Sequence, residues 1–196
     1  PFMETNDDNG EKIQGDWQIA TKSFVGASNK FFKDDFNDKT TFRTMFLEAM
    51  NRQNIEFSDF NKDYCYSFVL QHPKNRIVTL IKEPSISLVE VYHIISSESS
   101  DAHKFCHIHE VNRVECVKQI LYGSNTEVDI EDEKKFMFFP NRYDYNCYYE
   151  AKEQLASMNT DYNVMGFICK NFHGEPMRLK TRNPAYEEIK MLRGNQ

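Results

Sequence analysis

The sequence lacks several features that mark common classes of protein. No apolar run approaches the ~20 residues that a membrane-spanning helix needs. Neither the G-x-x-x-x-G-K-[ST] phosphate loop nor the G-x-S-x-G turn, which presents the nucleophilic serine of many hydrolases, occurs in it. The N-terminal stretch PFMETNDDNGEKIQGD is polar and acidic, unlike a secretory signal peptide. We therefore predict neither a membrane protein, nor a P-loop enzyme, nor a hydrolase of the nucleophile-elbow type.

The cysteine content does not favour a disulfide framework. The chain has five cysteines, an odd number, and most of them lie among apolar residues. Buried, reduced thiols in an intracellular protein are the simplest interpretation, and we predict a cytoplasmic or nuclear location. The run HKFCHIHEVNRVEC contains zinc-ligand residue types but does not combine the paired Cys-x2–4-Cys and His-x3–5-His spacings of structural zinc sites. We expect ordinary, partly buried residues there.

What the sequence does contain is typical of a folded globular domain. Its 196 residues suit one domain with a substantial core, and 16 Phe and 10 Tyr argue against disorder. The net charge of -6 argues against a general nucleic-acid coat but is compatible with a local basic groove. Because the chain does not begin with methionine, we expect residues 1–196 to be one partial domain, truncated at both ends.

The spacing of apolar residues predicts an α+β fold, with strands mostly in a meander and helices between them. Strands are predicted at residues 17–22, 64–71, 76–82 and 86–95, of which the last three form an antiparallel meander. Helices are predicted at residues 37–54, 112–123, 146–158 and 184–194, a short strand at 135–140, an acidic loop at 123–135, and a hairpin of 163–170 with 175–181. We expect Asp38 or Thr40 to cap the first helix and Gly123 to end the second.

Three cations alternate with other residues in RLKTRNPAYEEIKMLRGNQ, at the end of the chain. Arg178, Lys180 and Arg182 form this cation row, and in a strand they point to one face. A similar basic residue, Lys22, lies among the hydroxyls of Thr21 and Ser23. Phosphoryl transfer needs cations and hydrogen-bond donors fixed around the phosphates, which strands can provide. The alternative is a solvated edge strand whose cations block aggregation.

Five blocks, read in order, resemble successive motifs of the bacteriophage-type ATP-dependent RNA ligases, from about Trp17 to the last residue. They are WQIATKSFVG, YSFVLQHPKNRIV, LVEVY, NVMGFICK and RLKTRNPAYEEIKMLRGNQ. These ligases belong to the covalent nucleotidyltransferase superfamily, with the DNA ligases and the mRNA capping enzymes. The resemblance implies the fold of a ligase adenylation domain, which has antiparallel sheets and flanking helices.

The resemblance also implies a chemistry and a set of ligands. A lysine attacks the α-phosphate of ATP, the AMP passes to an RNA 5′-phosphate, and a 3′-hydroxyl displaces the AMP to seal the strand. ATP, Mg²⁺ and RNA ends are the implied cofactors and partners, RNA repair is an implied role, and no protein partner is implied. By position, the residues placed in catalysis are Lys22, Lys180 and Arg182. Those placed at the nucleotide are Thr21, Phe68, His72, Asn75, Arg76, Gly166 and Arg178.

Three departures from the family pattern matter for activity. The nucleophile motif K-x-D-G is absent, and we expect it to precede the first residue of this chain. Val69 or a neighbour stands where the family commonly has a glutamate, and Met165 precedes Gly166 where the family usually has Glu-Gly. Methionine cannot replace a carboxylate as a magnesium ligand. Glu90 is therefore the one candidate metal ligand that we name. Alternatively, Glu90 lies on the solvated face of its strand and binds no metal.

Two other functions remain open from the sequence. The first is a non-catalytic nucleotide- or RNA-binding domain that has kept the fold and the cation row, which the Val69 and Met165 departures favour. The second is the core of a DNA ligase or of a capping enzyme. Both of these enzymes need an additional oligonucleotide-binding domain after the adenylation domain.

Overall fold

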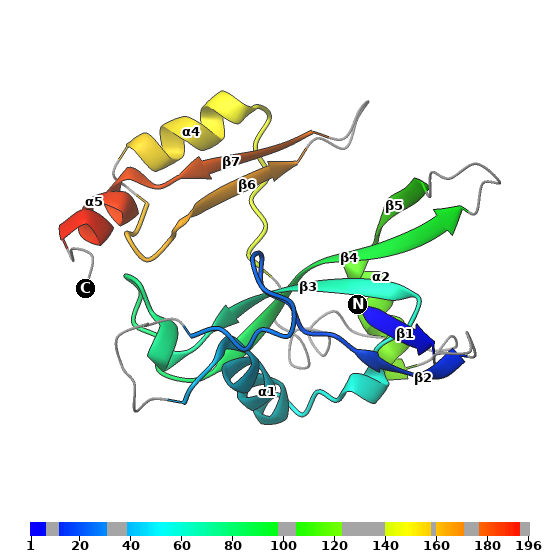
Figure 1. Cartoon of the computed structure of the whole chain (residues 1–196). Helices are drawn as coiled ribbons and strands as arrows, with labels where there is room; N and C mark the ends of the chain where they lie inside the picture. Colours follow the sequence, from blue (N-terminus) through cyan, green and yellow to red (C-terminus); the bar gives the residue numbers. More distant parts are fainter. Residues whose placement is uncertain are drawn as a thin grey trace. The chain divides into compact units, whose positions relative to one another are not determined.

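The computed structural model describes residues 1–6, 12–30, 39–97, 105–122, 140–157, 160–170 and 177–192 (Figure 1). The chain divides into two compact units. Unit 1 comprises residues 1–73 and 82–140, and unit 2 comprises residues 74–81 and 141–196. The segment 74–81 thus belongs to unit 2, although it lies in the sequence between two strands of unit 1.

Unit 1 contains an antiparallel three-stranded sheet and a separate hairpin. The sheet has the order β3-β4-β5 and consists of β3 (Tyr64–Gln71), β4 (Ser85–Ser97) and β5 (Phe105–Val111). The hairpin pairs β1 (Phe2–Asn6) with β2 (Lys12–Trp17). The helices are α1 (Phe42–Arg52) and α2 (Arg113–Tyr122), and short 3-10 turns occur at η1 (Phe57–Asp59) and η2 (Pro73–Asn75).

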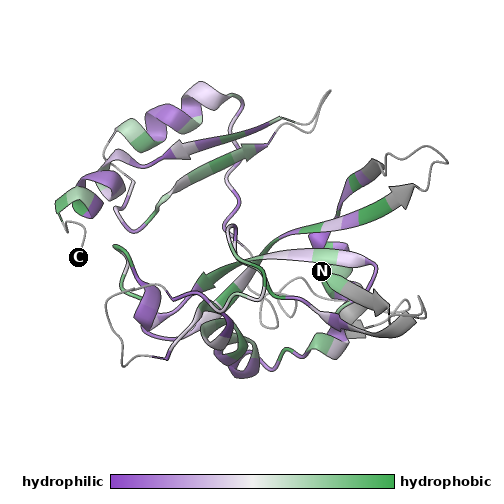
Figure 2. Cartoon of the chain, in the orientation of Figure 1, coloured by the Kyte–Doolittle hydropathy of each residue, from purple (hydrophilic) through white to green (hydrophobic). Residues whose placement is uncertain are grey.

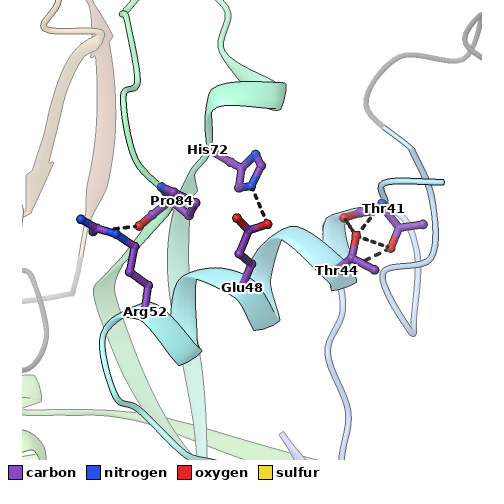
Figure 3. Close-up of polar contacts among 6 residues, drawn as sticks. All are labelled: Thr41, Thr44, Glu48, Arg52, His72 and Pro84. Carbon is purple, nitrogen blue, oxygen red and sulfur yellow. Dashed lines mark hydrogen bonds and ion pairs between the residues drawn. The ribbon is translucent and has the colours of Figure 1, made fainter. Parts of the chain in front are cut away.

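Helix α1 begins with a reciprocal threonine cap. The Thr41 hydroxyl accepts a hydrogen bond from the Thr44 backbone N–H at 3.2 Å, and the Thr44 hydroxyl accepts one from the Thr41 N–H at 2.8 Å (Figure 3). Two backbone donors that a helix start leaves unpaired are satisfied in this way. The predicted cap at Thr40 is wrong by one residue, since the extended backbone that a cap needs occurs at Thr41. Asp38 lies outside the described residues.

The core of unit 1 lies between the sheet and the two helices. Alternate residues of β4 and the inward faces of α1 and α2 meet there, and the hydropathy colouring shows hydrophobic residues recurring along these elements (Figure 2). The buried members are Ala49, Met50, Ile55, Phe60, Ile86, Leu88, Val91, Cys116 and Val117. Tyr66, Phe68 and other aromatic rings of β3 pack against this cluster.

Unit 2 is a hairpin with two helices. Strand β6 (Gly166–Lys170) pairs antiparallel with β7 (Arg178–Arg182), as predicted. Helix α4 (Tyr148–Ala156) precedes the hairpin, and α5 (Pro184–Leu192) follows it, with proline in its first position as predicted. Ala151 and Leu155 of α4 are buried with Phe167 of β6, and this cluster is the core of the unit.

Several predicted elements are confirmed, among them β3, most of β4, α2, α4, α5 and the final hairpin. The α+β class with antiparallel sheets and flanking helices is also confirmed. No helix in the described part of the chain is long and apolar enough to cross a membrane. The predictions for Gly123 and the acidic loop at 123–135 lie outside the described residues, as do all but the last residue of the predicted strand at 135–140.

Two predicted strands are wrong. Residues 76–82 form no strand, and β5 is the third strand of the meander instead. Strand β4 pairs with β3 along one edge and with β5 along the other, so residues 76–82 have no place beside β4, although 77–79 are β-branched. Residues 17–22 also fail as a strand, because β2 ends at Trp17 and a tight turn follows. The isolated bridge between Ala20 and Val25 closes that turn.

Candidate functional site

The cation row lies on one exposed face of the β6-β7 hairpin. Directly opposed residues of antiparallel strands point to the same side, so the register adds three residues of β6 to this face. Lys170 is opposite Arg178, Ile168 is opposite Lys180, and Gly166 is opposite Arg182. We call this set the cation face; it comprises Gly166, Ile168, Lys170, Arg178, Lys180 and Arg182. Arg178, Lys180 and Arg182 are all exposed, and hydrophilic colour dominates β7 (Figure 2).

Helix α4 packs on the other face of the hairpin. Phe167 and Thr181 are opposed in the register and are both 9% exposed. The Thr181 hydroxyl donates a hydrogen bond to the Tyr148 phenol oxygen of α4 at 3.1 Å. Residues on either side of each of these point the opposite way, because side chains alternate along a strand. Packing against α4 therefore leaves the cations on the face away from this helix.

The three cations of β7 differ in their partners. Arg182 is oriented by α5: its Nη1 atom is 2.9 Å from Oε1 of Glu187. The other oxygen of Glu187 is 3.8 Å from Nζ of Lys190, so this carboxylate lies between two cations. Lys180 makes no ion pair with any residue in the described ranges. Among the described residues, a phosphate that approaches Lys180 thus has no carboxylate to displace, whereas one that approaches Arg182 meets Glu187.

Gly166 is required by the close approach of the two strands. Its φ angle is +150°, a backbone conformation that residues with a side chain rarely adopt. A Cβ atom on it would lie 2.1 Å from the Thr181 carbonyl oxygen and 2.9 Å from the Arg182 Cα atom. The glycine of the Met165-Gly166 pair therefore has a structural cause that is independent of any ligand.

Asn183 holds the end of β7 in place, a role that was not predicted from the sequence. Its side chain is fully buried, and its Nδ2 atom donates to the carbonyls of Asp161 at 3.0 Å and Val164 at 2.9 Å. Its Oδ1 atom accepts the Ala185 N–H of α5 at 3.1 Å. An asparagine directly before a helix-starting proline is the signal that marks such a cap. These contacts of Asn183 thus fix the backbone directly after Arg182, at the end of β7.

Lys22 lies at the tip of a tight turn in unit 1. The Thr21 N–H donates to the Phe24 carbonyl at 2.9 Å, and the Thr21 hydroxyl contacts the same oxygen at 3.4 Å. Lys22 is exposed in this turn. The predicted place at a strand end is therefore corrected to a turn between Ala20 and Val25, which presents the ammonium on a short hydrogen-bonded loop.

The residues of the HPKNRIV block are divided between the two units. His72 is 4% exposed, and its Nε2 atom lies 3.2 Å from Oε2 of Glu48 on α1 (Figure 3). This contact ties the end of β3 to the helix. Asn75 and Arg76 follow in unit 2, at the end of η2 and just after it. In the same segment, the Thr79 hydroxyl donates to the Asn163 carbonyl at 3.1 Å.

Phe68 lies on the core face of β3. Its ring centroid is 5.5 Å from that of Phe46 and 5.9 Å from that of Phe60. These edge-to-face contacts are typical of packed aromatic cores. Val69, the next residue, points to the opposite face and is half exposed. Val69, at or next to the position where the RNA ligases commonly have a glutamate, thus presents an apolar side chain to solvent.

A β-bulge places Glu90 on the sheet face away from the core. Ser67 pairs with Glu90 and Phe68 pairs with Leu88, so Val89 is the extra residue of β4. Glu90 therefore shares the side of Ser67, yet it is only 3% exposed. The alternative of a solvated position is wrong. The Tyr92 hydroxyl donates a hydrogen bond to the Glu90 carboxylate. Within the described ranges, no group of three or more His, Cys, Asp or Glu residues could hold a metal ion.

Charge is distributed unequally between the two units. Unit 2 has ten Lys and Arg against seven Asp and Glu, a net charge of +3. Unit 1 has 14 Lys and Arg against 23 Asp and Glu, a net charge of -9. The overall value of -6 therefore conceals a basic unit, and this unit contains the cation face. A basic patch is the electrostatic signature expected for binding phosphates.

Comparison with known proteins finds one informative relative. An RNA ligase of Rhodothermus phage RM378 is 24% identical to the chain over 194 residues, which cover 90% of this chain and 42% of that protein. The chain thus spans less than half the length of this relative. No protein-family profile matches the chain, and no solved structure matches it. The similarity to a phage RNA ligase agrees with the class of protein that the ordered sequence blocks resemble.

Proposed function

We propose that the chain is part of an RNA-ligase-type adenylyltransferase domain, which uses ATP to join RNA 5′-phosphate and 3′-hydroxyl ends through a lysyl-AMP intermediate. The observation that carries this proposal is the cation face, where Lys180 and Arg182 are fixed on a strand and exposed. The phage relative supports RNA as the substrate. The adenylation-domain fold belongs to the same proposal.

The cation face would bind the phosphates of ATP or of an RNA end. Phosphoryl transfer depends mainly on positioned cations, so rigid residues contribute more than mobile ones. Lys180 has no competing carboxylate within the described ranges, whereas Arg182 is held by Glu187 and presents its remaining donors. Arg178 and Lys170 extend the positive face by one residue pair. The family resemblance assigns Lys22, which lies in unit 1, to the nucleotide or the RNA 5′ end.

Magnesium would be held chiefly by the phosphates and by water. Val69 and Met165 supply no oxygen ligand at the positions where the resembling family has carboxylates. Glu90 is buried and accepts a hydrogen bond from Tyr92, so we do not assign it as a metal ligand in this state. Magnesium bound mainly through substrate phosphates is common in nucleotide-dependent enzymes.

The first test removes the two central cations. Lys180→Ala with Arg182→Ala should weaken Mg-ATP binding by at least about tenfold, because each substitution removes a charge-assisted hydrogen bond to phosphate. Lys22→Ala should weaken it less. Lys152→Ala on α4 is the matched control, since this exposed lysine is in the same unit but not on the cation face. Unchanged affinity in titration calorimetry, with an intact circular dichroism spectrum, would remove the main support for the proposal.

The covalent step needs a nucleophile that this sequence does not contain in a K-x-D-G context. The test is to express the chain with any upstream coding sequence of its gene and to incubate it with α-labelled ATP and magnesium. A label that survives denaturation and is lost in acid indicates a phosphoramidate on lysine. This outcome is expected for a ligase whose metal site tolerates Met165.

A second candidate function is a non-catalytic nucleotide- or RNA-binding domain. The apolar, half-exposed Val69 and Met165 favour it, because both positions lack the carboxylate of the resembling enzymes. Under this function, the extended protein binds ATP or RNA but never acquires a stable label.

A further inference from the structure

Three aromatic rings gather beside the start of β6, in a part of unit 2 that the proposed function does not use. The rings of Tyr143 and Tyr145 are nearly parallel, with an interplanar angle of 14° and centroids 6.5 Å apart. Both lie on Phe167, whose centroid is 4.8 Å from that of Tyr143 and 5.8 Å from that of Tyr145. We call Tyr143, Tyr145 and Phe167 the tyrosine platform.

The tyrosine platform has one buried ring and two exposed rings. Phe167 is buried with Ala151 and Leu155 of α4, so it fixes the base of the cluster. Tyr143 is 48% exposed and Tyr145 is 36% exposed, so substantial ring surface meets water. Isolated exposed aromatic residues are ordinary, but here a buried third ring holds two near-parallel exposed rings in a preordered surface. Such a surface loses little conformational entropy when a planar ligand stacks on it.

The charges around the platform suit a ligand that has a negatively charged backbone and planar, uncharged side groups. Arg142 and Asp144 alternate with the two tyrosines, and their side chains form an exposed ion pair of 3.0 Å. This pair is neutral as a whole, so the platform itself presents no net charge. The unit around it has a net charge of +3, and the cation face lies on the opposite side of the same hairpin. Single-stranded nucleic acids bind to proteins that combine an aromatic surface with cations, and unit 2 has both.

We propose that the tyrosine platform stacks bases of a single-stranded RNA whose end is bound by the cation face, on the other side of the same hairpin. The inference rests on the proposed function for its RNA substrate, and it adds a base-contacting surface that the cation face does not provide. Stacking on aromatic rings tolerates any base, because every base has a π-face. The platform therefore contributes affinity for unpaired RNA without selecting a sequence.

The test measures binding of the whole chain to a labelled 12-nucleotide oligoadenylate and to a 12-unit abasic ribose-phosphate strand by fluorescence anisotropy. Tyr143→Leu with Tyr145→Leu keeps apolar contact with Phe167 but removes the aromatic faces. We expect at least about tenfold weaker binding of oligoadenylate and unchanged binding of the abasic strand. Tyr143→Phe with Tyr145→Phe should restore binding. Tyr162→Ala, at an exposed tyrosine outside the cluster, is the matched control.

The salt dependence separates this inference from the proposed function. The leucine variant should keep the wild-type slope of log K against log salt, since it leaves every phosphate-binding cation in place. Lys180→Ala with Arg182→Ala should lower that slope by about 0.7 for each phosphate that the protein no longer neutralises. If the leucine variant binds oligoadenylate as the wild type does, while the cation variant is weakened, the platform inference fails and the proposed function stands. If the wild type binds neither strand, both fail.

Discussion

Replacing Gly166 with alanine would place a methyl group 2.1 Å from the Thr181 carbonyl oxygen, well inside ordinary van der Waals contact. The atoms that it meets belong to the β7 backbone, so no side chain can rotate away. Either β6 moves away from β7 or the φ angle of +150° changes. In both cases the pairing of Gly166 with Arg182 and of Phe167 with Thr181 is disturbed. The cation face depends on this pairing.

The expected loss of free energy of unfolding in Gly166→Ala has two contributions. A backbone conformation reserved for glycine costs an alanine about 1–3 kcal/mol. Overpacking against a rigid neighbour costs about 1–3 kcal/mol more. Unit 2 has 64 residues, eight in 74–81 and 56 in 141–196, and at a typical ~0.05–0.15 kcal/mol per residue its stability is about 3–10 kcal/mol. Gly166→Ala should therefore remove about half of the free energy of unfolding of unit 2.

Hydrogen exchange with mass spectrometry is the assay, because it reports the two units separately. Peptides from β6 and β7 should exchange much faster in Gly166→Ala, whereas those from β3 and β4 should not change. Trp17 fluorescence is an independent monitor of unit 1, since its ring packs 5.8 Å from Phe60.

Gly26→Ala is the matched control for this experiment. Gly26 has a φ angle of +87°, but a Cβ atom there would meet nothing within 4 Å. We expect a loss of about 1 kcal/mol, confined to unit 1, because only the backbone strain remains. Wild-type exchange of β6 and β7 in Gly166→Ala would refute the reasoning, since it would show that the strands do not need this close approach.

The remaining predictions concern two buried side chains. Asn183→Ala should destabilise unit 2 by about 2–4 kcal/mol, because the substitution removes a fully buried amide and leaves the carbonyls of Asp161 and Val164 without this donor, and a loss below about 1 kcal/mol in urea unfolding would contradict this. Burial, with a smaller contribution from a neighbouring carboxylate, raises the pKa of the Cys116 thiol from 9.0 to about 11. The unfolded thiol thus loses its proton first, so the free energy of unfolding of unit 1 should fall by up to about 2–3 kcal/mol between pH 9 and 11. Cys116→Val should show a shallower fall over this range; a slope equal to that of the wild type would exclude this cause.

The predictable parts of the fold are those whose signals are local. The helical spacing of Met45, Ala49 and Met50 predicts α1, and the proline before a helical pattern predicts the start of α5. Strand alternation and flanking turn residues likewise predict β3 and the final hairpin. Each of these signals lies within a few residues, so it survives whatever the rest of the chain does.

The parts of the structure that were not predicted from the sequence depend on contacts between distant residues. Residues 76–82 have strong β propensity, yet both edges of β4 are taken by other strands. Strand β5 was missed because its histidines and cysteine were assessed as metal ligands and not as strand residues. The buried amide contacts of Asn183 and the tyrosine platform were missed for a different reason. Their roles depend on contacts with residues that lie 19 to 24 positions away in the sequence.

The sequence by itself determined that Arg178, Lys180 and Arg182 share one side of a strand, because side-chain direction in a strand alternates with every residue. Only the tertiary structure decided that Lys170 joins them, that Arg182 pairs with Glu187, and that a bulge at Val89 turns the buried Glu90 away from the core. The physical reason is that alternation is a property of the local backbone. Register, burial and ion pairing are set by which distant segments meet, and that depends on the packing of the whole unit.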